Sequence, residues 1–419
     1  MKIAVIGAGI VGVTTAYELA CDGHQVCVLE RRSAAAEEAS FANAGLVAPG
    51  YVTPWAAPGM PGKVLGHLLS RYAPVKVSLP LSRRDLIWMW KFYRACKLDT
   101  YLAHRSQLQR LAFYSRERLH DITSALKLDY ERSDGYMVLL RSAKDSKMVQ
   151  PGLQVLRDAG VTFKEISSGE ARKIEPALSP DMVFHGAIHL PDDEVGNCRQ
   201  FALMLKSEAQ RRGAEFSFNT GVASVSSNVG LGVAVSVAGE NMPRPFDAAV
   251  ICAGIDSVRL LKPLGLNIPL TAVHGYSISA AIREPINSPI SAVMDERYKV
   301  AISRLGNRVR VAGSAEIGGS IEKKRSSSLQ TLYKVLHDWF PGAANLSNGV
   351  QEWKGARPML PDGPPMVCAS GIAGVWLNLG HGSSGWALSC GSAKILSDLI
   401  GGKKPDLDLT EYAAQRLRA

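Results

Sequence analysis

Near its start the chain carries the sequence KIAVIGAGIVG, residues 2–12, and this stretch decides the fold. Residues 3–6 are a short apolar run bounded by glycine, which is typical of a buried parallel strand. The glycines that follow have the spacing G-x-G-x-x-G. Gly7 permits a sharp turn, Gly9 lets backbone approach a pyrophosphate, and Gly12 lets a helix pack against the strand. The pattern predicts a strand, a glycine turn and a helix.

The predicted helix, over about residues 10–21, points its N-terminus at the phosphates, and that end of a helix attracts anions. A second strand is predicted over residues 25–29, and Glu30 follows it where a carboxylate can accept from ribose hydroxyls. A glycine turn without a ligand is the alternative, but this order of elements favours a nucleotide. Because Glu30 would repel a 2′-phosphate, FAD or NAD fits better than NADP. The candidate contacts are Gly7, Ala8, Gly9, Ile10, Val11, Gly12, Glu30 and Arg31.

Composition limits the class of protein. At 419 residues the chain is long enough for two domains, each with its own core. Its seven cysteines form no C-x-x-C pair, so neither a zinc site nor a disulfide framework is indicated. The formal net charge of +10 favours anionic partners such as nucleic acid, lipid headgroups or acidic substrates. No nucleic-acid-binding module is recognisable.

No segment reaches the run of about 18 apolar residues that is needed to span a bilayer. Met1 and Lys2 precede an apolar stretch, as in a signal peptide, but the glycine motif occupies that stretch. No small-residue cleavage site precedes Glu18. We therefore expect the protein to stay in the cytoplasm.

Two further segments each allow two interpretations. Residues 40–50, SFANAGLVAPG, would let backbone N–H groups come close to a flat ring system, or they form an ordinary loop. Residues 83–94 carry Trp88, Trp90 and other aromatic residues among Arg and Lys. Such a helix can lie in the interface of an anionic membrane. Alternatively, its aromatic side chains belong to the core.

The rest of the chain gives a mixed pattern of strands and helices. We predict a hairpin over residues 128–141 with its turn at 133–135, and an antiparallel pair formed by residues 297–304 and 308–312. Near the end of the chain, a strand, a glycine turn and a helix ending near residue 400 follow one another in the same order as at the N-terminus. This order predicts a second contact with the cofactor. Other strands are predicted at 186–191, 215–218, 247–252 and 275–281, and other helices at 198–213 and 326–340.

Several motifs along the chain carry a resemblance to a known family. They are the N-terminal glycine motif, ANAG at 42–45 running into PGY at 49–51, PWAAPG at 54–59, HGYS at 274–277, DERYKVA at 295–301, RPM at 357–359 with PDG at 361–363, and GHG at 380–382 with GW at 385–386. Together they resemble the FAD-dependent amine oxidoreductases of the D-amino-acid oxidase superfamily, over essentially the full length. Within that superfamily the chain is similar to the small, flavin-carrying subunit of bacterial D-amino acid dehydrogenases.

The resemblance implies an α/β fold. A Rossmann-type FAD-binding domain, like that of glutathione reductase, would be joined to a second, α+β substrate domain built on a mixed or antiparallel sheet. The FAD-binding domain is expected to comprise residues 1–50, 185–269 and 350–419. The substrate domain is expected to comprise residues 51–184 and 270–349, with a basic-aromatic insert at about 83–118.

The resemblance also implies that FAD is the cofactor. We expect it to be bound non-covalently, because no flanking His or Cys is placed as an obvious attachment point, and we predict no metal site. Glu30 would then contact the adenosine ribose of FAD rather than that of NAD. Further cofactor contacts are expected from Asn43, Ala44, Gly45, Leu46, Val222, Cys252, Ala253, Gly254, Gly382, Ser383, Ser384, Gly385 and Trp386.

The implied reaction is oxidation of a D-amino acid to an imino acid, which water hydrolyses to a 2-oxo acid and ammonia. FAD would take the hydride and a membrane quinone would accept the electrons, which places the protein at the inner face of the cell membrane. Arg357 is the expected carboxylate anchor, because a guanidinium can grip a carboxylate with two hydrogen bonds. Tyr298 and Tyr276, on neighbouring predicted strands, would supply a hydroxyl, unless their rings belong to the core.

Substrate preference is the weakest part of the resemblance. The family often has a lysine where this chain has His274, and this chain has Ser383 and Ser384 in its Gly-His-Gly loop. One alternative is oxidation of a cyclic or N-methyl amino acid, such as hydroxyproline, proline, sarcosine or glycine, with oxygen as acceptor. A second is an FAD-binding subunit that is inactive alone. A nicotinamide-dependent dehydrogenase fits least, because the chain ends in a cofactor motif rather than in a separate catalytic domain.

Overall fold

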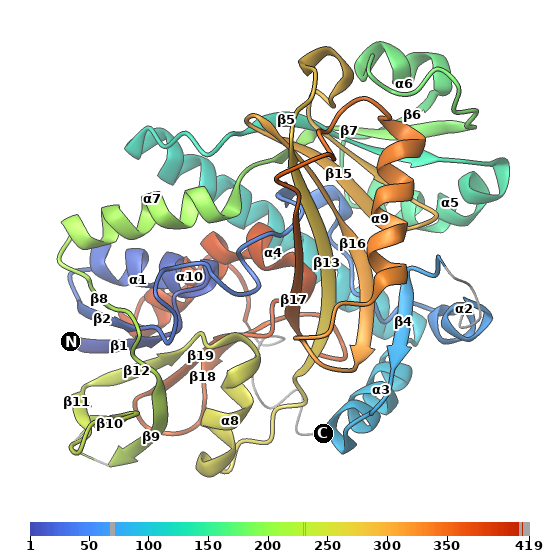
Figure 1. Ribbon diagram of the computed structural model, residues 1–419. Helices are drawn as coiled ribbons and strands as arrows, with labels where there is room; N and C mark the ends of the chain where they lie inside the picture. Colours follow the sequence, from blue (N-terminus) through green and yellow to red (C-terminus); the bar gives the residue numbers. More distant parts are fainter. Residues whose placement is uncertain (68–71, 229, 231, 410–412, 414–419) are drawn as a thin grey trace.

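The computed structural model describes residues 1–67, 72–228, 230, 232–409 and 413. In this part of the chain, two large sheets lie side by side, and Figure 1 shows the N-terminal sheet at the left and the larger sheet at the centre and right. Each sheet has hydrophobic core clusters of its own. The α/β fold class predicted from the sequence is confirmed.

The N-terminal sheet is mainly parallel, with the strand order β18-β19-β12-β1-β2-β8. All neighbours pair in parallel except β18 and β19, which are antiparallel. The bounds are β1 Lys2–Ile6, β2 Gln25–Leu29, β8 Glu215–Ser217, β12 Ala248–Ile251, β18 Met366–Ala369 and β19 Val375–Leu379.

Helices pack on one face of this sheet and a small sheet lies on the other (Figure 1). On the first face α1 packs against α7 and α10, and α10 packs against α4. On the second face a small antiparallel sheet lies beside the short helix α8. The bounds are α1 Ile10–Cys21, α4 Leu98–Leu126, α7 Cys198–Arg211, α8 Ser257–Leu261, α10 Gly385–Ile400, β9 Val222–Asn228, β10 Gly232–Val237 and β11 Arg244–Phe246.

The large sheet is mixed, with the order β17-β13-β16-β15-β14-β5-β7-β3; β4 also pairs with β16 and β6 with β7. The apolar side of α9 packs on its central strands. The strands are β3 Leu46–Val47, β4 Val75–Ser78, β5 Ser133–Leu140, β6 Lys164–Ser167, β7 Gly186–Val195, β13 Thr271–Ala281, β14 Ala292–Asp295, β15 Val300–Leu305, β16 Arg308–Gly318 and β17 Gln351–Met359. The helices on this side of the molecule are α2 Met60–His67, α3 Arg83–Ala95, α5 Ala143–Asp158, α6 Ser168–Ile174 and α9 Ser326–Trp339.

Most of the predicted elements are confirmed, but the hairpin over residues 128–141 is wrong. The structure has one strand there, β5, which pairs with β7 and with β14. The Ser-Asp-Gly sequence that indicated a turn instead forms a bulge between Asp134 and Tyr136, where Gly135 has a φ of 91°. An extra residue in a strand and a tight turn share the same glycine signal, because both need a positive φ.

The sheets divide the chain differently from the predicted domain boundaries. We expected residues 185–269 and 350–419 in the FAD-binding domain, yet β7 and β17 belong to the large sheet. The chain therefore passes between the two sheets inside each of these segments. Sequence alone does not show which sheet takes a strand, because both cores require the same apolar side chains.

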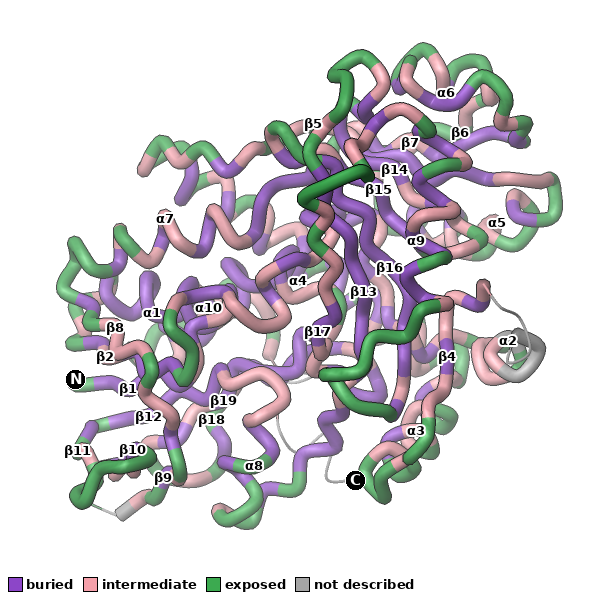
Figure 2. Tube along the Cα trace, viewed as in Figure 1, coloured by how far each residue is buried: buried purple, intermediate pink, exposed green. Residues whose placement is uncertain are grey.

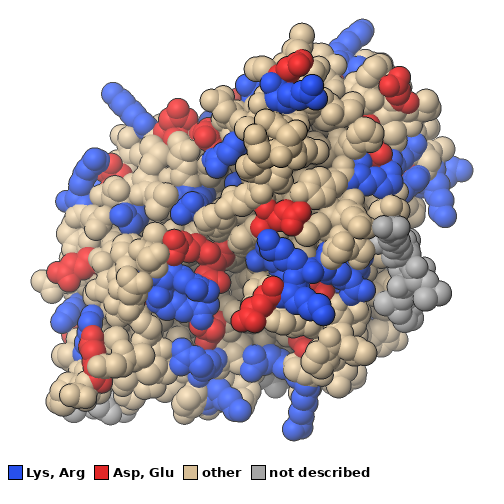
Figure 3. All heavy atoms as spheres, viewed as in Figure 1, with Lys and Arg blue, Asp and Glu red and all other residues tan. Residues whose placement is uncertain are grey.

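The strands of the two large sheets are mostly buried, whereas exposed residues gather in the loops and on the outer helices (Figure 2). On the face shown in Figure 3, Lys and Arg are spread over the molecule with acidic side chains between them. Among the described residues, no helix is both long enough and apolar enough to cross a membrane.

Candidate functional site

A cavity of about 1450 Å³ lies where the two sheets meet, and we call it the central cavity. Its wall combines the glycine motif of the N-terminal sheet, the loop that follows Ser40, strand β17, and the turn before α10. This volume exceeds the roughly 300–1,000 Å³ of a typical single-ligand pocket. The cavity is large enough for two ligands to meet.

One end of the cavity is formed by the turn between β1 and α1. A Cβ atom on Gly12 would lie 1.8 Å from the carbonyl oxygen of Gly7, so only glycine permits this approach of helix to strand. Gly7 itself has a φ of 102°, a left-handed value that glycine adopts without strain. Gly9 caps α1 without a side-chain cap, and the first turn carries no acidic residue. The hydroxyl of Ser40 accepts from the N–H of Ile10 at 3.0 Å, and the positive end of the helix faces the cavity, where it can attract an anion.

Glu30 stands beside this turn, buried, with 8% of its surface exposed. One of its carboxylate oxygens accepts from the backbone N–H of Ala8 at 2.7 Å and the other from that of Arg32 at 2.8 Å. These two bonds hold the carboxylate at the end of β2, and each oxygen keeps a further lone pair for an outside donor.

The loop at residues 43–46 forms a second wall, and three side chains hold its carbonyl groups. Arg310 donates to the carbonyl of Asn43 at 3.2 Å, Ser303 to that of Ala44 at 2.7 Å, and Trp386 to that of Gly45 at 3.1 Å. The loop is thus fixed from behind by the large sheet and by α10.

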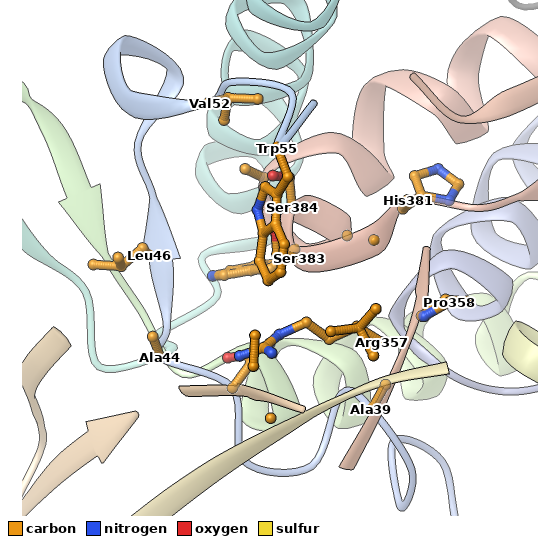
Figure 4. Close-up of a pocket in the computed structure, with 18 of the residues that line it drawn as sticks. Ala39, Ala44, Leu46, Val52, Trp55, Arg357, Pro358, His381, Ser383 and Ser384 are labelled. Carbon is orange, nitrogen blue, oxygen red and sulfur yellow. The ribbon is translucent and has the colours of Figure 1, made fainter. Parts of the chain in front are cut away.

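Arg357 reaches into the cavity from β17. In Figure 4 its side chain extends below Trp55 toward the loop that carries Ala44. The guanidinium lies 5.7 Å from the centre of the Trp55 ring and donates to the carbonyl of Ser314 at 3.0 Å. A Cβ atom on Gly275 would lie 2.4 Å from one of its nitrogens, so glycine at 275 makes room for it.

The charge of Arg357 has no counter-charge in the protein. Among the described residues, no carboxylate lies within ion-pair distance of this guanidinium. Burial without such a partner lowers the pKa of Arg357 to about 10. A cation in this position favours an anionic ligand.

The two tyrosines predicted as hydroxyl donors do not meet Arg357. Tyr276 contributes to the cavity wall, but its hydroxyl donates to Glu316 and accepts from the backbone N–H of Arg325. Burial and then the neighbouring Glu316 raise the pKa of Tyr276 further above its usual value of 10. Its ring packs in the core beside α9.

Tyr298 is not among the described residues that line the cavity. We predicted that it points inward from a strand beginning at residue 297, but β15 begins at Val300 and Tyr298 lies in the preceding turn. Its ring instead lies 4.8 Å from the guanidinium carbon of Arg141 and 5.7 Å from the Lys334 amine. The alternation of a strand does not apply to a turn, which is why the predicted direction is wrong.

His381 lines the cavity just before α10 (Figure 4). Its Nε2 atom is 3.0 Å from the hydroxyl of Ser392 on α10, and burial lowers the pKa of the ring to about 3. The imidazole is therefore neutral at physiological pH, and its contact with Ser392 indicates a structural role.

Comparison with known proteins identifies the family. A family model described as FAD dependent oxidoreductase matches residues 2–399. A D-amino acid dehydrogenase from Bradyrhizobium diazoefficiens is 40% identical over 418 residues, covering 99% of both chains. A protein of the same name from Cereibacter sphaeroides is 40% identical over 425 residues, covering 100% of this chain and 96% of its own.

The chain belongs to the FAD-dependent oxidoreductase family.

Solved structures share this fold. Glycine oxidase from Geobacillus kaustophilus gives a TM-score of 0.74 at 21% identity, covering 99% of both chains. Iminodiacetate oxidase from Chelativorans sp. BNC1 gives 0.73 at 21% identity, covering 98% of both chains.

FAD is accordingly the cofactor of this FAD-dependent oxidoreductase, and the cavity fits it. The N-terminus of α1 suits the pyrophosphate, the Glu30 carboxylate suits the ribose hydroxyls, and the fixed loop at 43–46 suits a flat ring. Among the described residues, no group of His, Cys, Asp and Glu side chains is arranged to hold a metal ion.

The structure brings most of the predicted cofactor contacts to one cavity. Ala8, Gly12 and Gly45 do not line it and instead shape the backbone behind it. Those that line it are Gly7, Gly9, Ile10, Val11, Glu30, Arg31, Asn43, Ala44, Leu46, Val222, Cys252, Ala253, Gly254, Gly382, Ser383, Ser384, Gly385 and Trp386.

Some residues of the site were missed by the sequence analysis. Arg310 and Ser303 hold the loop at 43–46, and Trp55 covers Arg357. None of the three positions carries a local signal. Arg310 alternates with Val309 and Val311 along the strand, so the pattern by itself puts Arg310 on the face opposite to these apolar residues, where a charged side chain is ordinarily exposed.

Two glycine substitutions separate cofactor binding from folding. The Cβ of Gly9→Ala would meet the hydroxyl of Ser40 at 3.4 Å and no other neighbour within 4 Å, so the chain itself has room for it. We expect this variant to keep its melting temperature without cofactor and to lose bound FAD, because the methyl group occupies the approach to the pyrophosphate. Gly12→Ala should lower both the melting temperature of the apoprotein and the amount of bound FAD, because its Cβ would clash with the carbonyl of Gly7. Flavin absorbance per protein and thermal unfolding of the apoprotein measure the two effects, and retention of full flavin by Gly9→Ala would contradict this geometry.

Proposed function

We propose that this enzyme oxidises D-amino acids to 2-oxo acids and ammonia and passes the electrons to a membrane quinone. The observation that carries the proposal is the uncompensated guanidinium of Arg357 in the wall of a cavity that suits FAD. The names of the relatives at 40% identity support D-amino acids as the substrates.

The arrangement at Arg357 suits the carboxylate of an α-amino acid. A carboxylate can accept two parallel hydrogen bonds from a guanidinium, which fixes both its position and its orientation. The guanidinium is itself held by the carbonyl of Ser314 and by the Trp55 ring. A bound carboxylate would supply the missing counter-charge and point the α-carbon into the cavity.

The protein has little proton transfer to perform. FAD, when bound, supplies an acceptor for the hydrogen that leaves the α-carbon with its bonding electron pair. The amine must arrive neutral and loses one proton as the C=N bond forms, and water then replaces the nitrogen and releases ammonia. Arg357 orients the substrate, and apolar side chains such as Trp55, Trp88 and Leu46 exclude water from the cavity.

The first test follows the colour of bound flavin without oxygen. We expect D-alanine to bleach the flavin and L-alanine to leave it oxidised. Bleaching only by proline, sarcosine or glycine would move the substrate to cyclic or N-methyl amino acids and contradict the proposal. Addition of either a quinone or oxygen to the bleached enzyme then identifies the acceptor, and we expect the quinone to restore the colour faster.

The second test removes the anchor. Arg357→Ala should weaken D-alanine binding by about 2–5 kcal/mol, as for loss of one partner of a buried charge pair. Arg357→Lys should retain part of the affinity, because the charge stays while the paired geometry is lost. FAD content should be unchanged in both.

Arg244→Ala is the matched control, because Arg244 pairs with Glu240 on the surface of the small sheet. Substrate titration of the flavin spectrum and steady-state kinetics provide the measurement. Unaltered kinetics for Arg357→Ala would remove Arg357 from the substrate site.

Helix α3 offers a surface for the membrane part of the proposal. The two sides of this helix differ in exposure. Trp88 is 1% exposed and donates to the carbonyl of Met359, whereas Trp90 is 55% exposed. The core interpretation thus holds for Trp88, and the exposed outer side of the helix supports the proposed membrane contact. The side chains exposed on the outer side are apolar ones, Leu86, Ile87, Trp90 and Tyr93, and basic ones, Arg83, Arg84 and Arg94.

The central cavity reaches this surface. Leu98 and Leu102, at the start of α4, both line the cavity and are 58% and 39% exposed. Phe92, on the inner side of α3, lines it as well. A lipid-soluble acceptor could thus enter from a membrane that contacts α3.

The third test measures binding to vesicles. We expect co-sedimentation with anionic vesicles that weakens when Trp90 and Tyr93 are both changed to serine, and that loses most of its salt dependence in Arg83→Ser, Arg84→Ser. Each basic residue near an anionic surface contributes about 1 kcal/mol, or roughly fivefold in binding. Val183→Ser is the control, because Val183 is 88% exposed in a loop between α6 and β7. Wild-type protein that fails to bind at any salt concentration would contradict membrane contact.

A further inference from the structure

The central cavity contains a second buried guanidinium, that of Arg105 on α4. Only 4% of this residue is exposed. It donates to the hydroxyl of Tyr101 at 3.0 Å and to the carbonyl of Gly152 at 3.1 Å, and its Nε atom has no partner. Within the described part of the chain, no carboxylate lies at ion-pair distance from it.

Two carboxylates that line the cavity near Arg297 and Lys299, those of Glu296 and Asp145, have partners other than Arg105. Glu296 accepts from Lys299 and from the hydroxyl of Tyr51, and Asp145 lies 2.7 Å from a nitrogen of Arg297. Arg105 therefore adds an uncompensated positive charge to the wall, as Arg357 does elsewhere in the cavity.

Segment 51–55 connects the two guanidinium groups. Tyr51, Thr53 and Trp55 all line the cavity. The hydroxyl of Thr53 lies 3.3 Å from that of Tyr101, which contacts Arg105, while Trp55 lies over Arg357. Thr53 and Trp55 are two residues apart, and two residues of extended chain span at most about 7 Å. Arg105, through Tyr101, and Arg357 are therefore both positioned beside this one short segment.

A purely structural role explains little of this arrangement. The bond from Arg105 to Gly152 joins α4 to α5, but a neutral donor would serve equally well. Burying an unpaired charge is costly unless a partner arrives. A guanidinium with a free Nε atom, buried in a ligand cavity, is suited to an anion that enters with the ligand.

We propose that Arg105, together with Tyr101 and Thr53, binds a carboxylate on the side chain of the substrate, so that the enzyme favours dicarboxylic D-amino acids. This inference rests on the proposed oxidation of D-amino acids. Arg357 would hold the α-carboxylate and Arg105 the second one, and the reacting α-carbon would lie between them. No step of the oxidation changes.

The first experiment compares substrates on the FAD-loaded wild-type enzyme. D-glutamate and D-aspartate are compared with D-glutamine, which has the length of D-glutamate without its charge, and with D-norvaline, which is apolar. We expect kcat/KM for the better dicarboxylate to exceed that for the uncharged substrates by about tenfold or more, mainly through KM, as for a hydrogen bond to a charged group. Equal or lower values for both dicarboxylates would overturn the proposal.

The second experiment uses variants. Arg105→Met keeps the bulk and should remove the preference for dicarboxylates, so that kcat/KM falls at least about fivefold more for the better dicarboxylate than for D-alanine. Arg105→Lys should restore part of the preference. Arg110→Met, which changes an exposed arginine on the same helix, is the control and should match wild type. Equal losses on every substrate would show that Arg105 acts on the fold and overturn the proposal.

The outcomes also separate this inference from the function on which it rests. If D-alanine reacts and the dicarboxylates have no advantage, only the second carboxylate site is refuted. If no D-amino acid bleaches the flavin, both proposals fail. The wild-type comparison decides the question even if Arg105→Met loses its flavin.

Discussion

The close approach of α1 to the end of β1 is the constraint on which the rest of the structure depends. At Gly12 the helix comes so near the carbonyl of Gly7 that no larger residue fits. This contact directs the N-terminus of α1 into the central cavity and places Ala8 where its N–H reaches Glu30. Because α7 and α10 pack against α1, and α4 against α10, one contact between glycines sets the position of a whole layer of helices.

Local patterns in the sequence predict local structure well. The bounds of α1 and β2 follow from apolar runs, glycines and an acid at the right spacing, and the presence of Arg357 in the cavity wall was expected from the resemblance of the motif at 357–359. Prediction fails where the outcome depends on a distant partner. Gly135 becomes a bulge rather than a turn because β7 pairs along the whole of β5. The direction of Tyr298 depends on a strand that begins three residues later than predicted.

The same limit explains the residues that the sequence did not reveal. Arg105 stands on a long helix rich in charged residues, and its burial depends on α5 and on segment 51–55. Arg310 holds a loop more than 260 residues earlier in the chain, as the 267-residue separation from Asn43 shows. Such contacts follow from the arrangement of the two sheets and cannot be obtained from spacing within one segment.

The order of strands in the N-terminal sheet has a consequence for how the protein is made. β1 lies at the centre of this sheet between β2 and β12, and the neighbour beyond β12 is β19, at residues 375–379. When synthesis begins, the first strand can pair only with β2, and its other edge stays open until residues 248–251 leave the ribosome. The sheet is complete only when residues 375–379 have emerged as well. Long-range pairing of this kind is slow and leaves apolar strand edges open, so the free edge of β1 is exposed to wrong pairing for most of synthesis.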